Sequence, residues 1–399
     1  MRVLFLTHRL PYAPNRGDRV RAYMILRTLA PRFDVELVSL VHDDDELAQV
    51  PRIDALGARV SAFKTSPIHN HLRAAFHLAG SRPLTHCLLD APGLLPALHK
   101  IVQKRPPDVV LAYCSGMARL AFEEPLSPYP LVIDLVDVDS AKWGTLARAA
   151  AWPRSWVFAR EAKHLAAFER RAARKAITTL VVNDRERNLL QAMAPDAAIR
   201  VVPNGVAVDH LRPPSRPTDA PHVVFCGVMN YQPNVQGVLW FAREVWPLVR
   251  ARHVDAQFTV VGSQPTTAIR KLASQNAGIT VTGSVPDVRE YLWEAAVSVA
   301  PLLTARGLQN KVLEAIAAGL PTVVTTAVAD GLPRRVLAAC SVADHGATFA
   351  ERVLELLSLS GAQRRSLASH ADLDHLRWDV QLAPIVPVLE QAAANAHVA

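Results

Sequence analysis

The chain has 399 residues, half of them hydrophobic and a fifth charged, and this balance excludes an intrinsically disordered protein. The length fits two domains that each bury a core of their own. Lysines and arginines number 44 against 36 aspartates and glutamates, a formal net charge of +8. Nucleic acid is a poor candidate partner, because the acidic run at 43–46 interrupts any continuous basic face and no known binding motif is present.

The first half of the chain alternates apolar, β-branched runs with helical patterns, which predicts a parallel α/β sheet. A Pro/Gly loop and a helix from about Asp18 to Leu29 follow the first run. The expected strands are Val3 to Thr7, Val35 to Leu40, Val109 to Ala112, Leu131 to Val136, Thr179 to Val182 and Ile199 to Val202.

A proline-rich stretch that ends at Pro221 is the clearest domain boundary. We therefore predict a Rossmann-like domain over 1–205, a linker over 206–221, a second Rossmann-like domain over 222–377 and a terminal helix over 378–399. The second half repeats the alternation of the first, so the fold class is two doubly wound parallel sheets. Its expected strands are Val223 to Cys226, Phe258 to Val261, Thr280 to Thr282, Val297 to Pro301 and Thr322 to Thr325.

The most informative segment covers positions 306–325. An apolar run precedes it, and the segment holds a glycine-bearing loop, an amphipathic helix that Gly319 and Pro321 end, and a β-branched run. Such a strand–loop–helix–strand unit directs the helix N-terminus to the carboxyl edge of a parallel sheet, where a diphosphate binds well. Glu314 lies farther along this helix, so a ligand that caps the helix can also be contacted at a hydroxyl.

This segment resembles the nucleotide-sugar signature of retaining glycosyltransferases of the GT-B fold, family 4. The signature carries two glutamates, and Glu314 matches the second, which in the family binds the ribose of the donor. The first would fall at position 306, where this chain has arginine. The segments from His8 to Arg21 and from Asp134 to Trp143 resemble sugar transferases of bacterial exopolysaccharide loci of the PEP-CTERM (EpsH-type) class. The resemblance implies two domains that face a cleft, with the terminal helix crossing back to the first.

A nucleoside diphosphate needs hydrogen-bond donors from both walls of such a cleft. On the first wall, Gly17 follows the first strand and lets backbone approach the diphosphate, and Arg21 lies one turn into the helix. An exposed surface arginine would show the same pattern. On the second wall, Gly227 ends a strand and opens a loop that contains Asn230.

Many family-4 enzymes place an arginine and a lysine in that second loop, and this chain has neither. We expect Arg306 and Lys311 to supply the cations, next to Asn310 and Glu314 on the same segment. Alternatively, Lys311 is a solvated side chain, although a cation in the first turn of a helix is unfavourable without an anion. Arg306 is expected to contact either phosphate or sugar.

Candidate catalytic groups also follow the strands of the first half. Asp137 and Asp139 come directly after an inner strand, and His8 ends the first one. Asp137 could orient an acceptor hydroxyl, while an Asx-turn or capping role is an equal alternative. The pair also matches the D-x-D string of metal-dependent transferases, but it lies in the wrong domain for donor binding, and family-4 enzymes usually need no metal. We expect no metal site.

The resemblance implies that a sugar moves, with retention, from a nucleoside diphosphate sugar to a hydroxyl of a glycan or lipid-linked acceptor in exopolysaccharide or cell-surface polysaccharide synthesis. No cofactor beyond the donor is expected. Two alternatives remain open. One is an enzyme of the UDP-sugar 2-epimerase type, which would use the same phosphate-binding edge. The other is a non-catalytic scaffold, an alternative that remains because the chain has arginine at position 306 in place of the first glutamate of the signature.

The sequence also predicts where the protein works. Its four cysteines are far apart and show no metal-binding spacing, and neither a signal peptide nor an apolar run of membrane-spanning length is visible. We expect a cytoplasmic protein. Residues 142–175 hold nine basic residues against two glutamates, with aromatic residues between them, a pattern that an anionic inner-membrane surface attracts. A solvated helix whose aromatic side chains pack on the domain is the alternative.

Overall fold

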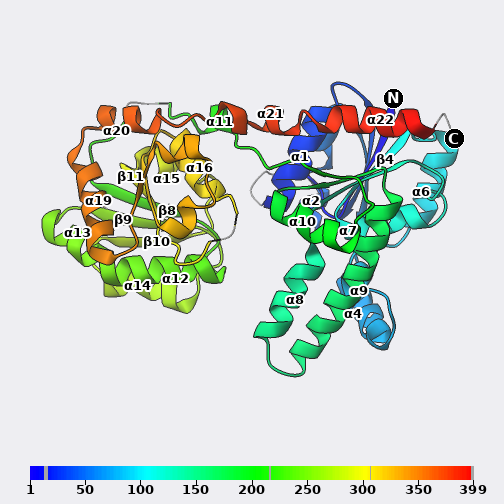
Figure 1. Cartoon of the computed structure of the whole chain (residues 1–399), viewed down its shortest axis with the longest axis horizontal. Helices are drawn as coiled ribbons and strands as arrows, with labels where there is room; N and C mark the ends of the chain where they lie inside the picture. Colours follow the sequence, from blue (N-terminus) through cyan, green and yellow to red (C-terminus); the bar gives the residue numbers. More distant parts are fainter. Residues whose placement is uncertain (13–16, 215–216, 306, 397–399) are drawn as a thin grey trace. The chain divides into compact units, whose positions relative to one another are not determined.

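The computed structural model describes residues 1–12, 17–214, 217–305 and 307–396. They form two compact units, one of Met1–Asn204 with Gln381–Ala399 and the other of Gly205–Val380. Each unit contains one sheet covered by helices (Figure 1). All strand pairs in both sheets are parallel, so the predicted fold class of two doubly wound α/β domains is confirmed.

The sheet of the first unit has the order β3-β2-β1-β4-β5-β6-β7. The central strand β1 is buried along its whole length, and Val3 pairs with Val35 on one side and with Val109 on the other. The seven strands are β1 Arg2–Thr7, β2 Asp34–Val41, β3 Arg59–Lys64, β4 Val109–Tyr113, β5 Leu131–Val136, β6 Thr178–Val181 and β7 Ile199–Val201.

Helices cover this sheet, and α22 at the end of the chain packs against β4 and β5. Two short 3-10 helices, η1 His77–Ala79 and η2 Arg119–Phe122, join longer elements. The α-helices are α1 Gly17–Leu29, α2 Asp44–Leu47, α3 Val50–Asp54, α4 Pro67–Phe76, α5 Leu84–Leu88, α6 Leu94–Lys104, α7 Ser115–Ala118, α8 Asp139–Ala149, α9 Arg154–Lys175, α10 Asp184–Met193 and α22 Ile385–Ala396.

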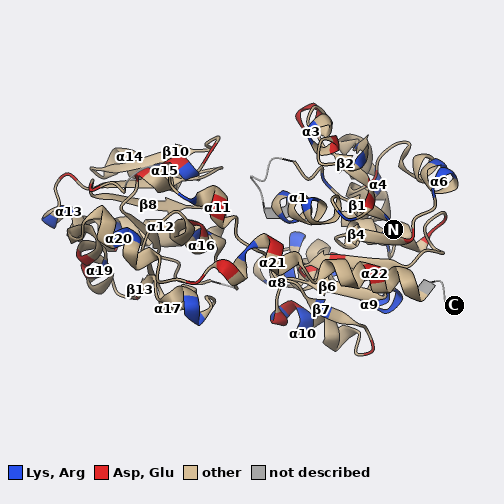
Figure 2. Cartoon of the chain, turned by 90° about the horizontal axis from the view of Figure 1, so that it is seen from above, with Lys and Arg blue, Asp and Glu red and all other residues tan. Residues whose placement is uncertain are grey.

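The sheet of the second unit has the order β10-β9-β8-β11-β12-β13. None of its strands carries a charged residue, and in Figure 2 the charged residues of this unit lie on helices and loops. Uncharged, largely apolar strands are typical of a parallel sheet that is covered on both faces. The strands are β8 His222–Cys226, β9 Gln257–Val261, β10 Ile279–Gly283, β11 Val297–Ala300, β12 Thr322–Val324 and β13 Cys340–Val342.

Short and medium helices surround this second sheet. A π-helical segment, η3 Phe241–Val245, joins α12 to α13, and the 3-10 helix η4 covers Asp374–Leu376. The α-helices are α11 Val208–Leu211, α12 Gln232–Trp240, α13 Trp246–Arg252, α14 Thr267–Gln275, α15 Arg289–Glu294, α16 Asn310–Ala317, α17 Thr326–Ala329, α18 Arg334–Leu337, α19 Gly346–Ser358 and α20 Gly361–Ala368. The boundary between the two units falls inside α21, Trp378–Leu382.

The proline-rich stretch that the sequence suggests as a linker belongs to the second unit. The Thr218 carbonyl accepts a hydrogen bond from Arg364 at 2.6 Å, and the Asp219 carboxylate accepts one from the Gly361 N–H at 2.6 Å. Val206 forms an isolated parallel bridge with Arg377. These contacts hold the described part of 206–221 on α20 and on the segment before α21.

In both sheets the first strand along the chain lies in the interior, and the next two strands extend from it to one edge. The fourth strand then pairs with the other side of the first strand. This order places a topological switch point between β1 and β4 in the first unit and between β8 and β11 in the second. In open parallel sheets, ligands bind outside the carboxyl ends of the strands at such a point. We therefore expect a ligand site of the second unit at the loops after β8 and β11.

Candidate functional site

Gly227 follows β8 at the switch point of the second sheet. A Cβ at this position would lie 2.7 Å from the Asn234 Nδ2 and 3.3 Å from the Lys311 Nζ. The Gly227 N–H donates to the Val261 carbonyl at 2.9 Å, which fixes the loop to β9. A glycine is required here because α12 and α16 both bring polar side chains against the backbone.

Lys311 stands in the first turn of α16, and its ammonium is the positive centre of this cluster. The Nζ donates to the Asn234 Oδ1 at 2.5 Å and lies 4.7 Å from the centroid of the Phe225 ring. Burial lowers the pKa of Lys311 to about 8. No carboxylate forms an ion pair with it among the residues that the structure describes.

Asn234 positions that ammonium, and sequence reasoning missed it. Its side chain is 4% exposed, and its Nδ2 donates to the Val228 carbonyl at 2.9 Å. With the amide group held in this way, the Oδ1 is turned to Lys311. The sequence pattern that could have indicated Asn234 is an asparagine near the start of a helix that follows a glycine loop. The apolar residues Val235 and Val238 lie on the same helix.

Glu314 lies one turn after Lys311 on α16 and is partly buried. Burial raises its pKa to about 7, against the opposing effect of the Lys311 charge. Its carboxylate has no hydrogen-bond partner within the described ranges. A carboxylate in this position can accept hydrogen bonds from ligand hydroxyls, which is the role that the sequence motif predicts.

The N-terminus of α16 completes the cluster. Gln309 precedes the helix and forms no side-chain hydrogen bond to its first N–H groups. These groups and the positive end of the helix dipole favour an anion. Asn310, the first helical residue, is exposed. The predicted cation Arg306 lies outside the described residues.

Asn230 is an exposed residue of the loop after β8. Its Nδ2 donates to the Oε1 of Gln264, a residue that adopts a positive φ of 54° after β9. This bond ties the β8 loop to the β9 loop, so Asn230 shapes the rim of the site, while Asn234 contacts Lys311.

In the first unit, the Arg21 side chain is buried among contacts within the protein. The side chain is 1% exposed, and its Nε donates to the buried Asp134 carboxylate at 2.9 Å. Its Nη1 donates to the Asn204 Oδ1 at 3.0 Å. Arg21 therefore ties α1 to β5 and to the end of the first unit, because a buried guanidinium needs a buried carboxylate in place of water. Its Nη2 is buried and has no hydrogen-bond partner within the described residues, and a diphosphate contact stays a prediction.

The other predicted residues of the first unit gather at the carboxyl edge of its sheet. His8 follows β1 and stacks on Tyr113, with ring centroids 5.6 Å apart. Asp137 is exposed. Burial raises the pKa of Asp139, while the charges of Lys142 and His8 oppose this rise and that of Asp137 adds to it. Gly17 is the first residue of α1, and the loop directly before it lies outside the described residues.

Backbone strain marks this same edge. Val136 adopts a φ of +67°, which is rare for a β-branched residue, and the register between β5 and β6 shifts between Asp134 and Val136. Such strain clusters at functional sites. It directs the segment that carries Asp137 and Asp139 away from the ladder. Nowhere in the described ranges do three or more His, Cys, Asp or Glu side chains converge as a metal ion would require.

Comparison with known proteins gives a family match for part of the chain. Residues 220–359 match the family described as "Glycosyl transferases group 1". The match lies in the second unit, which carries Gly227, Lys311 and Glu314. No curated protein matches the sequence.

Several solved structures share the whole fold. Anabaena Alr3699/HepE in complex with UDP-glucose is 16% identical, with a TM-score of 0.61 and 100% of both chains covered. A glycosyltransferase from Rickettsia africae ESF-5 is 11% identical, with a TM-score of 0.60 and 99% of each chain covered. A protein described as a UDP-N-acetylglucosamine 2-epimerase from Listeria monocytogenes is 11% identical, with a TM-score of 0.57 and coverage of 98% and 96%. At these identities the likeness shows the fold, which is GT-B.

Together, the family match and the fold support a GT-B glycosyltransferase. Membership of family 4 and of the exopolysaccharide branch stays a prediction from the sequence motifs.

Proposed function

We propose that the protein moves a sugar, with retention of configuration, from a nucleoside diphosphate sugar to an acceptor hydroxyl in bacterial exopolysaccharide or cell-surface polysaccharide synthesis. The observation that carries the proposal is Lys311, a partly buried ammonium without a carboxylate partner among the described residues, held at the N-terminus of α16. A diphosphate supplies the anion that this environment favours. The Anabaena protein of similar fold has been solved in complex with UDP and with UDP-glucose, which supports a nucleotide-sugar donor.

The chemistry follows from where charge develops. As the bond to the sugar breaks, negative charge builds on the departing diphosphate. Lys311 and the first N–H groups of α16 stabilise that charge without reorganisation, because Asn234 already orients the ammonium. Glu314 accepts hydrogen bonds from the donor ribose. Arg306 is the proposed second cation, and no cofactor beyond the donor takes part.

The acceptor is a hydroxyl of a glycan or of a lipid-linked glycan. We assign its positioning to the edge of the first sheet, where His8 and Asp137 lie near the strained end of β5. Asp137 is exposed and can accept a hydrogen bond from a hydroxyl group. Retention, the acceptor class and the pathway rest on the family resemblance of the sequence.

We also propose that the hairpin of α8 and α9 contacts the inner face of the cell membrane, which would place the protein on its cytoplasmic side. The hairpin projects from the first unit (Figure 1). Eight of the nine basic residues in 142–175 are exposed, Arg160 being the exception, and both acidic residues, Glu161 and Glu169, are buried. The exposed charge of the hairpin is therefore wholly basic. No described helix combines the length and the apolar character that crossing a bilayer requires.

An epimerase is the second candidate, because the Listeria protein shares the fold. The two activities differ in their products. A transferase releases nucleoside diphosphate when an acceptor is added, whereas an epimerase returns an isomeric nucleotide sugar without an acceptor. Chromatography of the nucleotide products, with and without a lipid-linked glycan, separates the two.

Donor binding tests the site directly. The protein is titrated with UDP, GDP and ADP and with their glucose conjugates by calorimetry. Glu314→Ala is expected to weaken binding of the preferred nucleotide by about 1–3 kcal/mol, and Lys311→Met by at least as much, because each leaves a hydrogen-bonding partner unmatched. Lys271→Met, an exposed lysine on α14 of the same unit, is the control and should bind as the wild type does. Equal nucleotide affinities in the wild type and all three variants would show that the donor does not bind at Lys311 and Glu314.

A further inference from the structure

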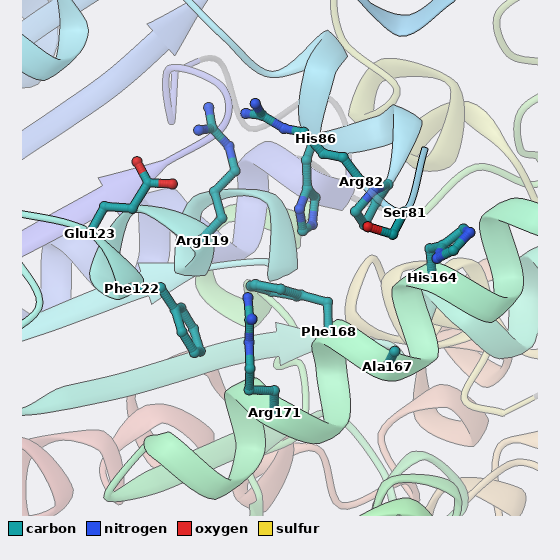
Figure 3. A pocket seen from close by; sticks show the side chains of 11 residues that line it. Ser81, Arg82, His86, Arg119, Phe122, Glu123, His164, Ala167, Phe168 and Arg171 are labelled. Atoms are coloured by element: carbon teal, nitrogen blue, oxygen red, sulfur yellow. The ribbon is translucent and has the colours of Figure 1, made fainter. Parts of the chain in front are cut away.

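The first unit contains a pocket that the proposed reaction does not use. It lies between α5, η2 and α9 and has a volume of about 420 Å³ (Figure 3). Pockets of about 300–1,000 Å³ hold small ligands. Its lining includes three arginines, two histidines and two phenylalanines: Arg82, Arg119, Arg171, His86, His164, Phe122 and Phe168.

The pocket has an excess of positive charge. Glu123 is the acidic residue of its lining, against three guanidinium groups. Arg119 lies 3.8 Å from the Asp90 carboxylate and donates to the Leu89 carbonyl, but its buried Nε has no partner. Within the described part of the chain, neither Arg82 nor Arg171 forms an ion pair. Three guanidinium groups around one cavity repel each other, and the carboxylates of Asp90 and Glu123 offset only part of this charge.

His86 adds an unsatisfied group to the same cavity. It is 3% exposed, and its ring meets the edge of Phe168 at a centroid distance of 4.5 Å. Its Nε2 is buried and has no hydrogen-bond partner. Burial, and then the charges of Arg119, Arg82 and Arg171, lower the pKa of His86 to about 3. The ring is therefore neutral near neutral pH and can donate one N–H to a ligand oxygen.

Aromatic rings fix one of the cations. The Arg171 guanidinium lies 4.6 Å from the centroid of Phe122 and 5.5 Å from that of Phe168. Stacking of this kind limits the rotation of the side chain, so less entropy is lost when its fork binds an oxyanion. In Figure 3, Phe122, Phe168 and Arg171 form one part of the lining, with His86 on the other side of Phe168.

The backbone around the pocket is held firmly. Arg160 on α9 donates to the carbonyls of His77, Leu78, Gly80 and Arg82. The next residue, Glu161, accepts hydrogen bonds from the N–H groups of Leu84 and Thr85 at the start of α5. These bonds hold the loop that carries Arg82 and the helix that carries His86 against α9. A site with a supported backbone is pre-organised for its ligand.

We propose that this pocket binds a phosphate or diphosphate group of a phosphorylated ligand. Guanidinium forks bind phosphate oxygens bidentately, a neutral imidazole donates a further hydrogen bond, and the two phenylalanine rings take the carbon skeleton next to the phosphate. The residues lie in the first unit, whereas the proposed donor site lies in the second. The same chemistry fits a soluble phosphate ester and a lipid headgroup.

Inorganic pyrophosphate is the probe for this proposal. Full-length protein with labelled histidine is titrated with it, and the His86 ring signal is followed by NMR after assignment with His86→Gln. Saturable movement of that signal and a higher pKa of His86 are expected. Arg171→Gln and Arg82→Gln should each weaken pyrophosphate binding by at least about tenfold, since each removes a charge-assisted contact. Arg174→Gln, one turn farther along α9 and exposed, is the matched control and should bind as the wild type does.

A His86 signal that does not respond, or an equal loss in Arg174→Gln, would overturn the proposal. Competition with lipid vesicles identifies the source of the phosphate. If phosphatidate vesicles displace pyrophosphate and phosphatidylserine vesicles of equal surface charge do not, the pocket binds a lipid headgroup. Otherwise it binds a soluble phosphate ester. The donor site is tested separately. Arg171→Gln should keep the nucleotide affinity of the wild type, and Lys311→Met should keep the His86 response.

Discussion

At the level of single residues, Lys311 and Glu314 form the best-defined part of the donor site. Asn234 holds the Lys311 ammonium near the positive end of the α16 dipole, which is unfavourable for a cation. Glu314, one turn later, is partly buried and has no hydrogen-bond partner in the described chain. Burial moves their pKa values to about 8 and about 7, toward neutral pH. Side chains tuned in this way are typical of functional sites.

The affinity for nucleoside diphosphate should depend on pH through Lys311. The ordinary pKa of a lysine is 10.5, and burial lowers it here to about 8 in the free protein. A bound diphosphate favours the protonated form, so the free protein must take up a proton on binding once the pH exceeds about 8. Affinity is therefore expected to fall steadily above that pH. Calorimetry between neutral pH and pH 10 measures it, and Lys311→Met should lack this decline. The same decline in the variant would assign it to another group.

Sequence reasoning placed residues on the right elements where they share one short segment, while their roles at the site stay predictions. Lys311 and Glu314 lie on one predicted helix, and the glycine after a predicted strand marked Gly227. It failed where the partner lies far away along the chain. The Arg21 guanidinium pairs with Asp134, which is 113 positions later, and nothing in the local pattern indicates this. Lys311 likewise meets Asn234 across 77 positions.

At the level of secondary structure, the sequence predicted the inner strands and the edge strands β7 and β10, but not the edge strands β3 and β13. Largely apolar, buried runs mark the inner strands, such as β4 and β11, because helices cover them on both faces. The edge strand β3 mixes charged and apolar residues and is largely half-buried or exposed, so its pattern is not apolar enough. The edge strand β13 is only three residues long. Neither strand carries an apolar run long enough to predict it from the sequence.

The close approach of two loops at the site gives a test at this level. A Cβ on Gly262 would lie 1.6 Å from the Gly227 carbonyl oxygen, and Gly262 has a φ of +152°. Gly262→Ala should therefore cost about 3 kcal/mol or more of unfolding free energy and weaken donor binding, because the loop of Gly227 must move. Gly283→Ala is the control: its φ is +74° but nothing lies within 4 Å, so about 1–2 kcal/mol is expected, from backbone strain alone. Urea unfolding measures both, and equal losses would contradict the steric argument.

At the level of the whole molecule, the chain consists of two units with separate hydrophobic cores and the same order of strands around a switch point. The sequence predicts both units, because strands and helices alternate twice. The proline-rich stretch was a reasonable linker, yet backbone and side-chain hydrogen bonds attach it to the second unit. Proline content indicates where a chain lacks regular structure, and it does not show what that segment packs against.

Membrane contact by the α8–α9 hairpin is a property of the whole molecule and can be tested on it. Trp152, between the two helices, is 81% exposed, and Trp156, in the first turn of α9, is 52% exposed. Both lie next to basic side chains that no acidic side chain of 142–175 offsets at the surface. Aromatic rings enter the headgroup region while cations attract anionic lipids. Replacing both tryptophans by alanine should weaken binding to vesicles with anionic lipid by about tenfold or more, since each buries a large apolar ring.

The structure allows a specific control for this test. Val254→Ala removes an apolar side chain that is 69% exposed in the second unit, and it should leave vesicle binding unchanged. By contrast, Trp143 is half-buried and packs against Phe158 at a centroid distance of 5.2 Å. Sedimentation with vesicles at increasing salt separates the two contributions: the basic residues make binding salt-sensitive, and the tryptophans leave a part that salt does not remove. If the double variant sediments with vesicles as well as the wild type, the hairpin is a solvated helix pair and the protein reaches its acceptor without it.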